Sequence, residues 1–480
     1  MSRRYAALVA AFSLFAAVDA SAAGFAVAGG YQEMEIDLDT GLPSRWVSCD
    51  RVCTDADARR IELAGPGGGA LRWPGAPPQA GGFVPSVERT AEHVRVDLRS
   101  AADERVVIAY ELALTSARVA LTLPAGVALL QSVGPAFQPD ALPGFGAAFS
   151  DIERVRVGPA GQAKWVADAA PEVATGDWVG FRQRFWAWLV VAGEGVQADV
   201  AMPSSAAVFG EIAWRADSAS RTLQFYAGPI EWRALAAVDA PLTGMLYASL
   251  WEPLRWLCRV LYEILRQLLA VIGSPGLAII LLSLVVKILL APLSAIADRW
   301  QRDVNRIQSR IQPKIAAIKA EYRGEEAHVR TLAVYKEEGV HPLFTMKSLA
   351  GFAIQVPMFI AAFDMLADNI ALAGTSFLWI ADLAAPDRAA ALPVALPFFG
   401  AHLNLLPACM TAISLLSAWL QRDATLNEAL QRQQRVQLYG MAAAFFLLFY
   451  TFPSGMVLYW TANNFWHLVK EQVLDRMRRR

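Results

Sequence analysis

Alternating apolar and polar residues mark the first half of the chain. The stretches HVRVDLRS (93–100), RVVIAYELAL (105–114) and ARVALTLPAG (117–126) have the period of two that is typical of half-buried strands. Segments rich in glycine and proline, such as GPGGGALRWPGAPPQAGG at 65–82, separate them and are typical of loops. Short strands divided by turns predict a β-sandwich domain over residues 24–240.

A helical pattern replaces this alternation over residues 241–272. Apolar residues recur there at helical spacing, with charged residues on the opposite face. The apolar set is Trp251, Leu254, Leu257, Cys258, Leu261 and Leu265, and the charged set is Glu252, Arg255, Arg259, Glu263 and Arg266. We predict an amphipathic helix that lies in the membrane interface.

Long apolar runs dominate residues 273–480. Five of them reach or approach the length that crosses a bilayer, and they lie near 275–293, 344–366, 403–420, 437–452 and 454–470. The short, proline-rich segment 391–400 is interpreted as interfacial rather than as a sixth span. The predicted fold class is therefore a polytopic α-helical membrane protein with a five-helix core and an N-terminal β-sandwich.

The segment 298–342, between the first two predicted spans, is helical in character. Its first part carries an isoleucine stripe (Ile307, Ile311, Ile315 and Ile318), and a second helical run follows the turn at Gly324. This pattern predicts a helical hairpin. We expect that the hairpin alone cannot bury the stripe, which would pack on the bilayer surface or on a partner; a solvated connector is the alternative.

Composition and the opening residues support a membrane location. Hydrophobic residues make up 55% of the 480-residue chain and charged residues only 18%, below the quarter that is usual for soluble domains. The start, MSRRYAALVAAFSLFAAVDASAAG, has a basic region, an apolar stretch and a small-residue pattern. Residues 1–23 are therefore predicted to be a signal peptide, with a retained first transmembrane helix as the alternative.

The distribution of basic residues predicts the orientation. The segments 298–342 and 421–436 and the tail DRMRRR are rich in Arg and Lys, whereas 367–402 holds one base, Arg388. The positive-inside rule then places the hairpin and the C-terminus in the cytoplasm and residues 24–240 on the opposite, exported side of the membrane. The basic tail either meets ribosomal RNA through its phosphates or anchors the topology, and no sequence-specific nucleic-acid binding is expected.

One lysine stands inside the first predicted span. Lys287 interrupts LSLVVKILLAPLS and shares a helical face with Ser283 and Ser294. Gln355 and Pro357 lie in the second span, and the last span carries a polar stripe of Tyr459, Asn463, His467 and Lys470. Such wet faces can enclose a hydrophilic cavity. Two alternatives remain: Lys287 snorkels to the cytoplasmic interface, and Gln355 only joins helices.

The candidate chemistry is otherwise sparse. Cys49 and Cys53 lie in the exported part, where a local disulfide is compatible with the compartment but a three-residue spacer leaves its geometry open. No cysteine–histidine set, phosphate-binding glycine loop or nucleophile–base pair stands out in the sequence. We therefore expect no metal, no cofactor and no catalytic residues, and we do not expect an enzyme.

The order and spacing of several motifs resemble the YidC/Oxa1/Alb3 membrane protein insertase family, in its bacterial form with a periplasmic domain. The likeness covers nearly the whole chain. The motifs are DWVGFRQRFWAWLV and FYAGPIEW in the exported part, then GLAIILLSLVVKILLAPLS, IQPKIAAIKAEYRGEEAHVRTLAVYKEEGVHPL, IQVPMF, FLWIADLAAPD, NLLPACMTAISLLSAWLQ and FFLLFYTFPSGMVLYWTANNFW.

The resemblance implies a function. A groove in the five-helix insertase core would receive the polar segment of a nascent membrane protein and release it sideways into the lipid of the bacterial inner membrane. Nascent membrane proteins and the bilayer would be partners, and the ribosome and the Sec translocon are further candidates.

The resemblance also assigns residues to this groove. Lys287 matches a groove arginine of the family, with the charge kept and the planar five-donor fork lost. Ser283 matches a hydroxyl position, Tyr459 and Trp460 match aromatic positions that touch substrate, and Gln355 with Pro357 matches the substrate-facing second span. Two other functions remain alternatives: a secondary transporter with Lys287 as its substrate site, and a sensor or scaffold whose sandwich binds a ligand.

Overall fold

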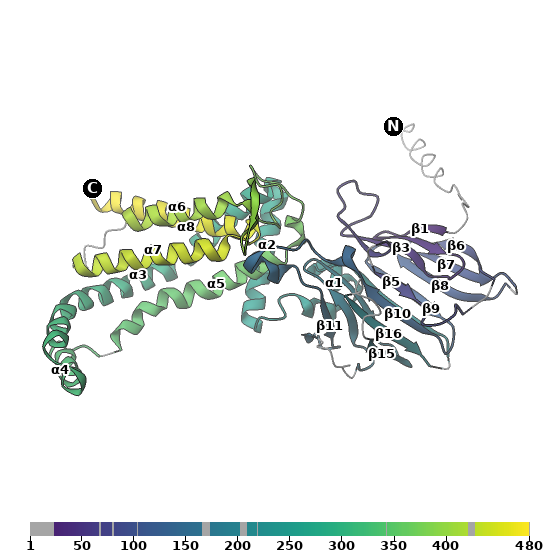
Figure 1. Cartoon of the computed structure of the whole chain (residues 1–480), viewed down its shortest axis with the longest axis horizontal. Coiled ribbons are helices and arrows are strands. Elements are labelled where there is room, and N and C mark those ends of the chain that lie inside the picture. The colour runs from purple at the N-terminus through teal and green to yellow at the C-terminus, as the bar shows by residue number, and fades with distance from the viewer. Residues whose placement is uncertain are drawn as a thin grey trace, which may run out of the picture. The chain divides into compact units, whose positions relative to one another are not determined.

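The computed structural model describes residues 24–66, 69–78, 81–102, 104–165, 173–201, 209–217, 219–341, 343–420 and 428–479. The predicted signal segment 1–23 lies outside these residues. The chain forms two compact units (Figure 1). The β unit comprises the described parts of 24–139 and 151–246, and the helical unit comprises 140–150 together with the described parts of 247–479.

The β unit is built from antiparallel strands in three sheets. Their orders are β1-β2-β3-β4, β15-β16-β10-β5 and β12-β11-β13-β14-β17-β9-β8-β7-β6. The strands are β1 Gly24–Ala28, β2 Gln32–Asp37, β3 Pro43–Cys49, β4 Arg60–Ala64, β5 Ala70–Arg72, β6 Phe83–Arg89, β7 His93–Ser100, β8 Val106–Ala113, β9 Arg118–Leu123, β10 Ala128–Val133, β11 Glu153–Val157, β12 Ala163–Trp165, β13 Trp178–Arg182, β14 Trp186–Val191, β15 Val196–Ala201, β16 Gly210–Ala216 and β17 Arg221–Pro229.

The alternation in the sequence accounts for the long sheet. In β7, every second side chain (Val94, Val96 and Leu98) is buried, and the residues between them are more exposed. The three strands expected near 93–100, 105–114 and 117–126 are confirmed as β7, β8 and β9. Antiparallel pairing joins them as consecutive neighbours, as short loops between successive strands favour.

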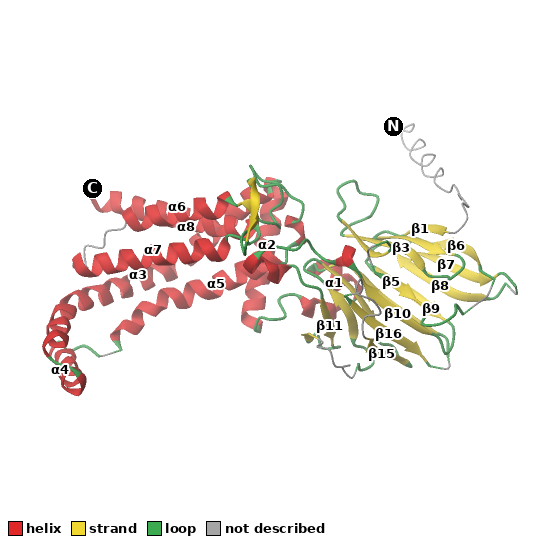
Figure 2. Ribbon diagram, in the orientation of Figure 1, coloured by secondary structure: helices red, strands yellow, loops and turns green. Residues whose placement is uncertain are grey.

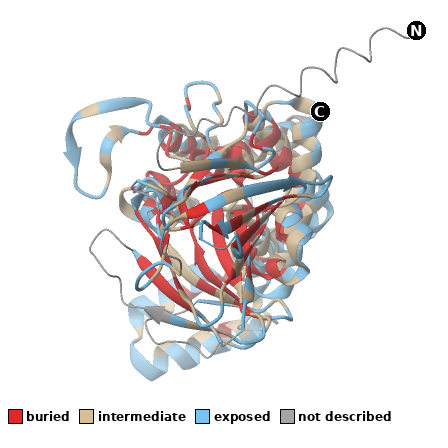
Figure 3. Cartoon of the chain, turned by 90° about the vertical axis from the view of Figure 1, so that its right-hand side faces the viewer, coloured by how far each residue is buried: buried red, intermediate tan, exposed pale blue. Residues whose placement is uncertain are grey.

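The two small sheets lie on the large one and enclose the core, which Figure 3 shows as buried strands. The Trp46 ring of β3 meets Trp188 of β14 and Phe225 of β17 edge to face, with centroids 5.6 and 5.5 Å away. Trp46 Nε1 donates to Gln32 Oε1 at 2.7 Å, and Gln32 Nε2 donates to the Ala227 carbonyl at 2.6 Å. These contacts confirm the predicted β-rich domain, and α1 (Trp232–Val238) follows its last strand.

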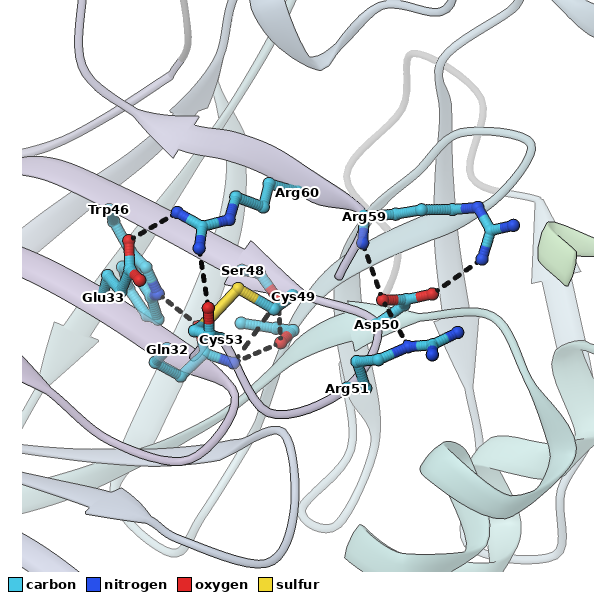
Figure 4. The surroundings of a disulfide bond; sticks show 11 residues. Gln32, Glu33, Trp46, Ser48, Cys49, Asp50, Arg51, Cys53, Arg59 and Arg60 are labelled. Carbon is cyan, nitrogen blue, oxygen red and sulfur yellow. Dashed lines mark hydrogen bonds and ion pairs between the residues drawn. A yellow bond between two sulfur atoms is a disulfide. The ribbon is translucent and has the colours of Figure 1, made fainter. Parts of the chain in front are cut away.

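Cys49 and Cys53 are joined in a disulfide at the end of β3, with Cα atoms 5.4 Å apart. Ion pairs surround it (Figure 4): Arg59 Nη1 lies 3.0 Å from Asp50 Oδ2, and Arg60 Nη2 donates to the Cys53 carbonyl at 2.6 Å. The bond therefore fixes a tight loop between β3 and β4 whose backbone is also held by hydrogen bonds.

The helical unit contains seven helices longer than ten residues among its described residues, and a two-stranded hairpin (Figure 2). The helices are α2 Glu252–Ile272, α3 Pro275–Glu321, α4 Gly324–Glu337, α5 Ala350–Ala367, α6 Leu405–Leu420, α7 Glu428–Phe449 and α8 Ser454–Arg479, and the hairpin strands are β18 Ala390–Leu396 and β19 Gly400–Leu403. The segment 391–400, expected to be interfacial, forms much of this hairpin. Four residues of the predicted stripe are buried in α2, namely Leu254, Cys258, Leu261 and Leu265, whereas Trp251, just before the helix, is exposed.

One described helix, α3, is long and apolar enough to cross a membrane. Ala353–Ala367 and Leu405–Leu420 are shorter apolar helices. At a rise of about 1.5 Å per residue, α6 is roughly 24 Å long, less than the roughly 30 Å of hydrocarbon in a typical bilayer. Polar residues such as Asn463 and Lys470 lower the hydropathy of α8. The number of spans and their topology remain predictions.

The α3–α4 hairpin corrects one expectation. The first hairpin helix is not separate, because α3 runs for 47 residues from the first expected span to Glu321. Half of the isoleucine stripe is buried within the hairpin: Val334 of α4 packs against Ile311 and Ile315, which are 2% and 7% exposed, and Ile307 and Ile318 are partly buried beside them. The expectation that the hairpin alone cannot bury the stripe was therefore wrong for Ile311 and Ile315, because Val334 folds back over them, whereas the outer two isoleucines of the stripe stay partly exposed.

Candidate functional site

A cavity of about 460 Å3 opens between α3, α5 and α8. Five of the seven candidate groove residues line it: Lys287, Gln355, Tyr459, Trp460 and Asn463. Tyr459 and Asn463 both reach the cavity because residues at i and i+4 share one face of a helix, here α8. Residues of the polar stripes predicted from the sequence therefore line one open cavity.

Lys287 is half-buried in the cavity wall. No hydrogen bond or ion pair reaches its ammonium group from any of the described residues. Asp298 and Glu471 attract the charge through space, whereas Lys470 repels it. The ammonium group therefore faces the cavity without a direct partner.

A second charged group of residues lies at the same wall. Lys470 Nζ of α8 donates to Asp298 Oδ2 of α3 at 2.9 Å. His467 lines the cavity one turn earlier on α8 and interacts electrostatically with Lys287, Lys470 and Asp298. The polar stripe predicted His467 and Lys470 on this face, but it did not indicate that Asp298 would pair with Lys470.

Ser283 and Pro357 lie outside the cavity. The Ser283 side chain is fully buried, and its hydroxyl donates to the Ile280 carbonyl of its own helix at 2.7 Å. Pro357 stands inside α5, where it removes the backbone hydrogen bond to the Ala353 carbonyl. Neither side chain is placed to meet a molecule in the cavity.

Aromatic rings form part of the cavity wall. Phe359 and Trp460 both line it, and their ring centroids are 4.5 Å apart. Phe445 and Phe449 of α7 also contact the Trp460 ring, at 5.4 and 5.8 Å. Phe359 and Trp466 were not among the predicted residues, although Trp466 falls on the α8 stripe three residues after Asn463.

The segment 140–150 packs against the helix ends beyond this cluster. The Phe149 ring contacts Phe363 of α5 and Phe452, with centroids 6.2 and 5.5 Å away. The Gly146 backbone N–H donates to Thr451 Oγ1 at 3.1 Å, and a Cβ atom at this position would lie 2.3 Å from the Thr451 carbonyl oxygen. Glycine is required here because the two backbones approach so closely.

Known proteins match about half of the chain in sequence. The family described as 60Kd inner membrane protein matches residues 267–480. The membrane protein insertase YidC of Chlamydia trachomatis serovar D is 33% identical over 249 residues, which cover 50% of this chain and 30% of that protein. The YidC of Chlamydia muridarum is 31% identical over 276 residues, covering 52% of this chain and 33% of that protein.

A solved structure also aligns over most of the chain. It is a crystal structure of an active YidC insertase with the first transmembrane domain resolved, at 16% identity and a TM-score of 0.37. The alignment covers 94% of this chain and 92% of that one. In contrast, the sequence matches to the two Chlamydia proteins span only about a third of the length of those proteins.

Proposed function

We propose that the protein is a membrane protein insertase of the bacterial inner membrane, because residues 267–480 match the family described as 60Kd inner membrane protein and similar proteins include YidC insertases. A client polypeptide would place a polar segment in the cavity between α3, α5 and α8. Its apolar segment would then leave sideways into lipid. The protein would supply solvation rather than covalent chemistry.

The observation that carries this proposal is the half-buried, directly unpartnered ammonium of Lys287 in the cavity wall. An ionisable group in a membrane helix usually faces a bundle interior or water, because facing lipid costs at least about 3 kcal/mol. The neighbouring side chains of Gln355 and Asn463 support a groove rather than a lysine that snorkels away from the helices.

Solvation by such a groove explains how insertion could proceed without a nucleotide. A polar group that enters hydrocarbon without a hydrogen-bond partner costs several kcal/mol. Side chains of the cavity and the water around them would replace part of the lost hydration. The barrier for a polar tail would fall most where it could contact both Lys287 and Asn463.

The proposed topology follows from the charge pattern. Residues 24–240 would lie in the periplasm, five segments of the helical unit would cross the membrane, and the α3–α4 hairpin and the C-terminus would be cytoplasmic. Nascent membrane proteins would be the clients. The ribosome and the Sec translocon are candidate partners on the cytoplasmic and membrane sides.

Photocrosslinking tests the site. A photoreactive residue at Gln355 or Asn463 should crosslink to a stalled nascent single-span membrane protein, because both side chains line the cavity. The same residue at Ser283 is the matched control and should give little product, since that side chain is buried against its own helix. Equal yields at all three positions would rule out the cavity as the client site.

Substitution of the lysine tests the charge. Lys287→Ala should reduce insertion of clients with charged tails, whereas Lys287→Arg should keep it because the charge remains. Insertion can be scored by protease protection of the translocated tail in proteoliposomes. Equal insertion by Lys287→Ala and the unaltered protein across a client panel would refute a role for this charge.

A further inference from the structure

The charged side chains of the cavity are few and unequally paired. Three charged residues line it, Lys287, Asp298 and Lys470, and the one histidine is His467. With His467 neutral, two positive charges and one negative charge leave a net charge of +1. The single carboxylate contacts Lys470, so Lys287 is the cation with no direct partner.

The Asp298–Lys470 contact joins two helices that are far apart in sequence. The two atoms are 2.9 Å apart, and the Lys470 and Asp298 side chains remain 36% and 46% exposed. An ion pair this exposed is weak and exchanges readily with other partners. The pair is therefore weak enough to open when another anion enters the cavity.

We propose that Asp298 determines client specificity by standing in for a client carboxylate. In the empty cavity Asp298 holds Lys470 and lowers the repulsion between Lys470 and Lys287. A carboxylate in the tail of an incoming polypeptide displaces Asp298, so that both lysines face the client. This inference rests on the proposed insertase function and adds a residue that sets how strongly acidic tails are preferred.

The proposal makes the preference depend on a simple charge count. Asp298→Asn raises the cavity charge from +1 to +2 and removes the competitor. Lys470→Gln lowers the charge to zero and leaves Asp298 as an unpaired anion that repels acidic tails. Asp298→Glu keeps both the charge and the ion pair. The ratio of acidic to neutral clients bound in the cavity should therefore be highest in Asp298→Asn, intermediate in Asp298→Glu and the unaltered protein, and lowest in Lys470→Gln.

The experiment uses the full chain in proteoliposomes, with a photoreactive residue at Gln355. The probes are two stalled nascent chains of one single-span protein whose short N-terminal tail carries either Asp-Asp or Asn-Asn. The measured quantity is the ratio of their crosslinking yields. Asp298→Asn should raise this ratio roughly threefold, as one unit charge acting across a wet cavity would, and Lys470→Gln should lower it below that of the unaltered protein.

Glu338→Gln supplies the matched control. It removes the carboxylate partner of Lys314 from an ion pair between α3 and α4, outside the cavity. The ratio should stay unchanged in this variant and in Asp298→Glu. An unchanged ratio in Asp298→Asn, or shifts in the same direction in Asp298→Asn and Lys470→Gln, would overturn the proposal.

Anionic lipid is the competing occupant. Vesicles of phosphatidylcholine alone and vesicles with added phosphatidylglycerol should give the same threefold change. A change that appears only when phosphatidylglycerol is absent would assign the site to a lipid phosphate and overturn the polypeptide reading. If neither probe crosslinks to the unaltered protein, the proposed insertase function is refuted. The total crosslinking yield reports that outcome separately from the ratio of the two yields.

Discussion

A buried amide of the β unit and the polar side chains at the cavity of the helical unit differ in how they are partnered. In the β unit, Gln131 Oε1 accepts from Trp214 Nε1 at 3.0 Å, and Gln131 Nε2 donates to the Trp188 carbonyl at 3.1 Å. In the helical unit, Lys287 and Asn463 line a cavity, and their side chains make no hydrogen bond within the described residues.

The difference separates stability from function. A buried amide whose donor and acceptor are both satisfied fixes one packing arrangement of the sheets, because any shift leaves it unpaired. A polar group left facing a cavity stabilises nothing by itself, yet it can receive a group from another molecule. We therefore expect substitutions in the β core to change folding first and substitutions at the cavity wall to change client contacts first.

Replacing one tryptophan in each unit gives the largest expected effect. Trp46→Ala should lower the free energy of unfolding of the β unit by about 3–5 kcal/mol, because a fully buried ring is lost and Gln32 loses its donor. Trp460→Ala should cost less stability but reduce client crosslinking, since that ring is half-buried at the cavity. Hydrogen exchange of strand peptides and crosslinking yield measure the two outcomes.

The contrast between the units would fail if the two tryptophans behaved alike. An unchanged exchange rate in Trp46→Ala would show that the β core is not held by this ring. A loss of exchange protection in Trp460→Ala as large as that in Trp46→Ala would show that the cavity wall is a structural core.

A smaller loss of stability is expected when the docking of the segment 140–150 is disturbed. Gly146→Ala places a Cβ atom against the Thr451 carbonyl oxygen, so the segment must shift, at a cost of about 1–3 kcal/mol. Faster proteolysis within 140–150 would report the release. Gly75→Ala is the control, because a Cβ atom there meets nothing within 4 Å. Equal protease resistance in both variants would contradict the close docking.

Reduction of the disulfide tests whether the β unit depends on its internal contacts for stability. Loss of the Cys49–Cys53 bond should lower β-unit stability by roughly 2 kcal/mol, the value expected for so short a loop. Dithiothreitol should therefore shift the denaturation midpoint of the unaltered protein but not that of the Cys49→Ala/Cys53→Ala variant. A shift of equal size in both would mean that the reductant acts elsewhere.

Local patterns in the sequence predicted what depends on neighbouring residues. The period of two gave β7, β8 and β9, and helical spacing brought Tyr459, Trp460 and Asn463 to one cavity. The same reasoning did not find Ser283 to be buried, because a helical face shows which residues share a side but not which helix covers it.

Long-range contacts account for the other features that the sequence did not predict. The Asp298–Lys470 pair joins residues 172 positions apart, and the contact of Gly146 with Thr451 spans 305 positions. No local period encodes either contact. The hairpin shows the same limit at shorter range, since the burial of Ile311 depended on how α4 folds back over it.

Acid should loosen the α3–α4 hairpin, the smallest effect expected. Lys314 Nζ donates to Glu338 Oε1 at 2.5 Å and, with Arg310, lowers the pKa of Glu338. A carboxylate whose pKa is lower in the folded than in the unfolded state stabilises the folded hairpin. This contribution is complete at pH values above the unfolded-state pKa of about 4.3, and it is lost as the pH falls through the folded-state pKa. Spin labels at Arg306→Cys and Lys336→Cys should therefore report a wider distance distribution below about pH 4. Glu338→Gln should show the wider distribution at every pH; a pH response that survives this substitution would assign the loosening to another group.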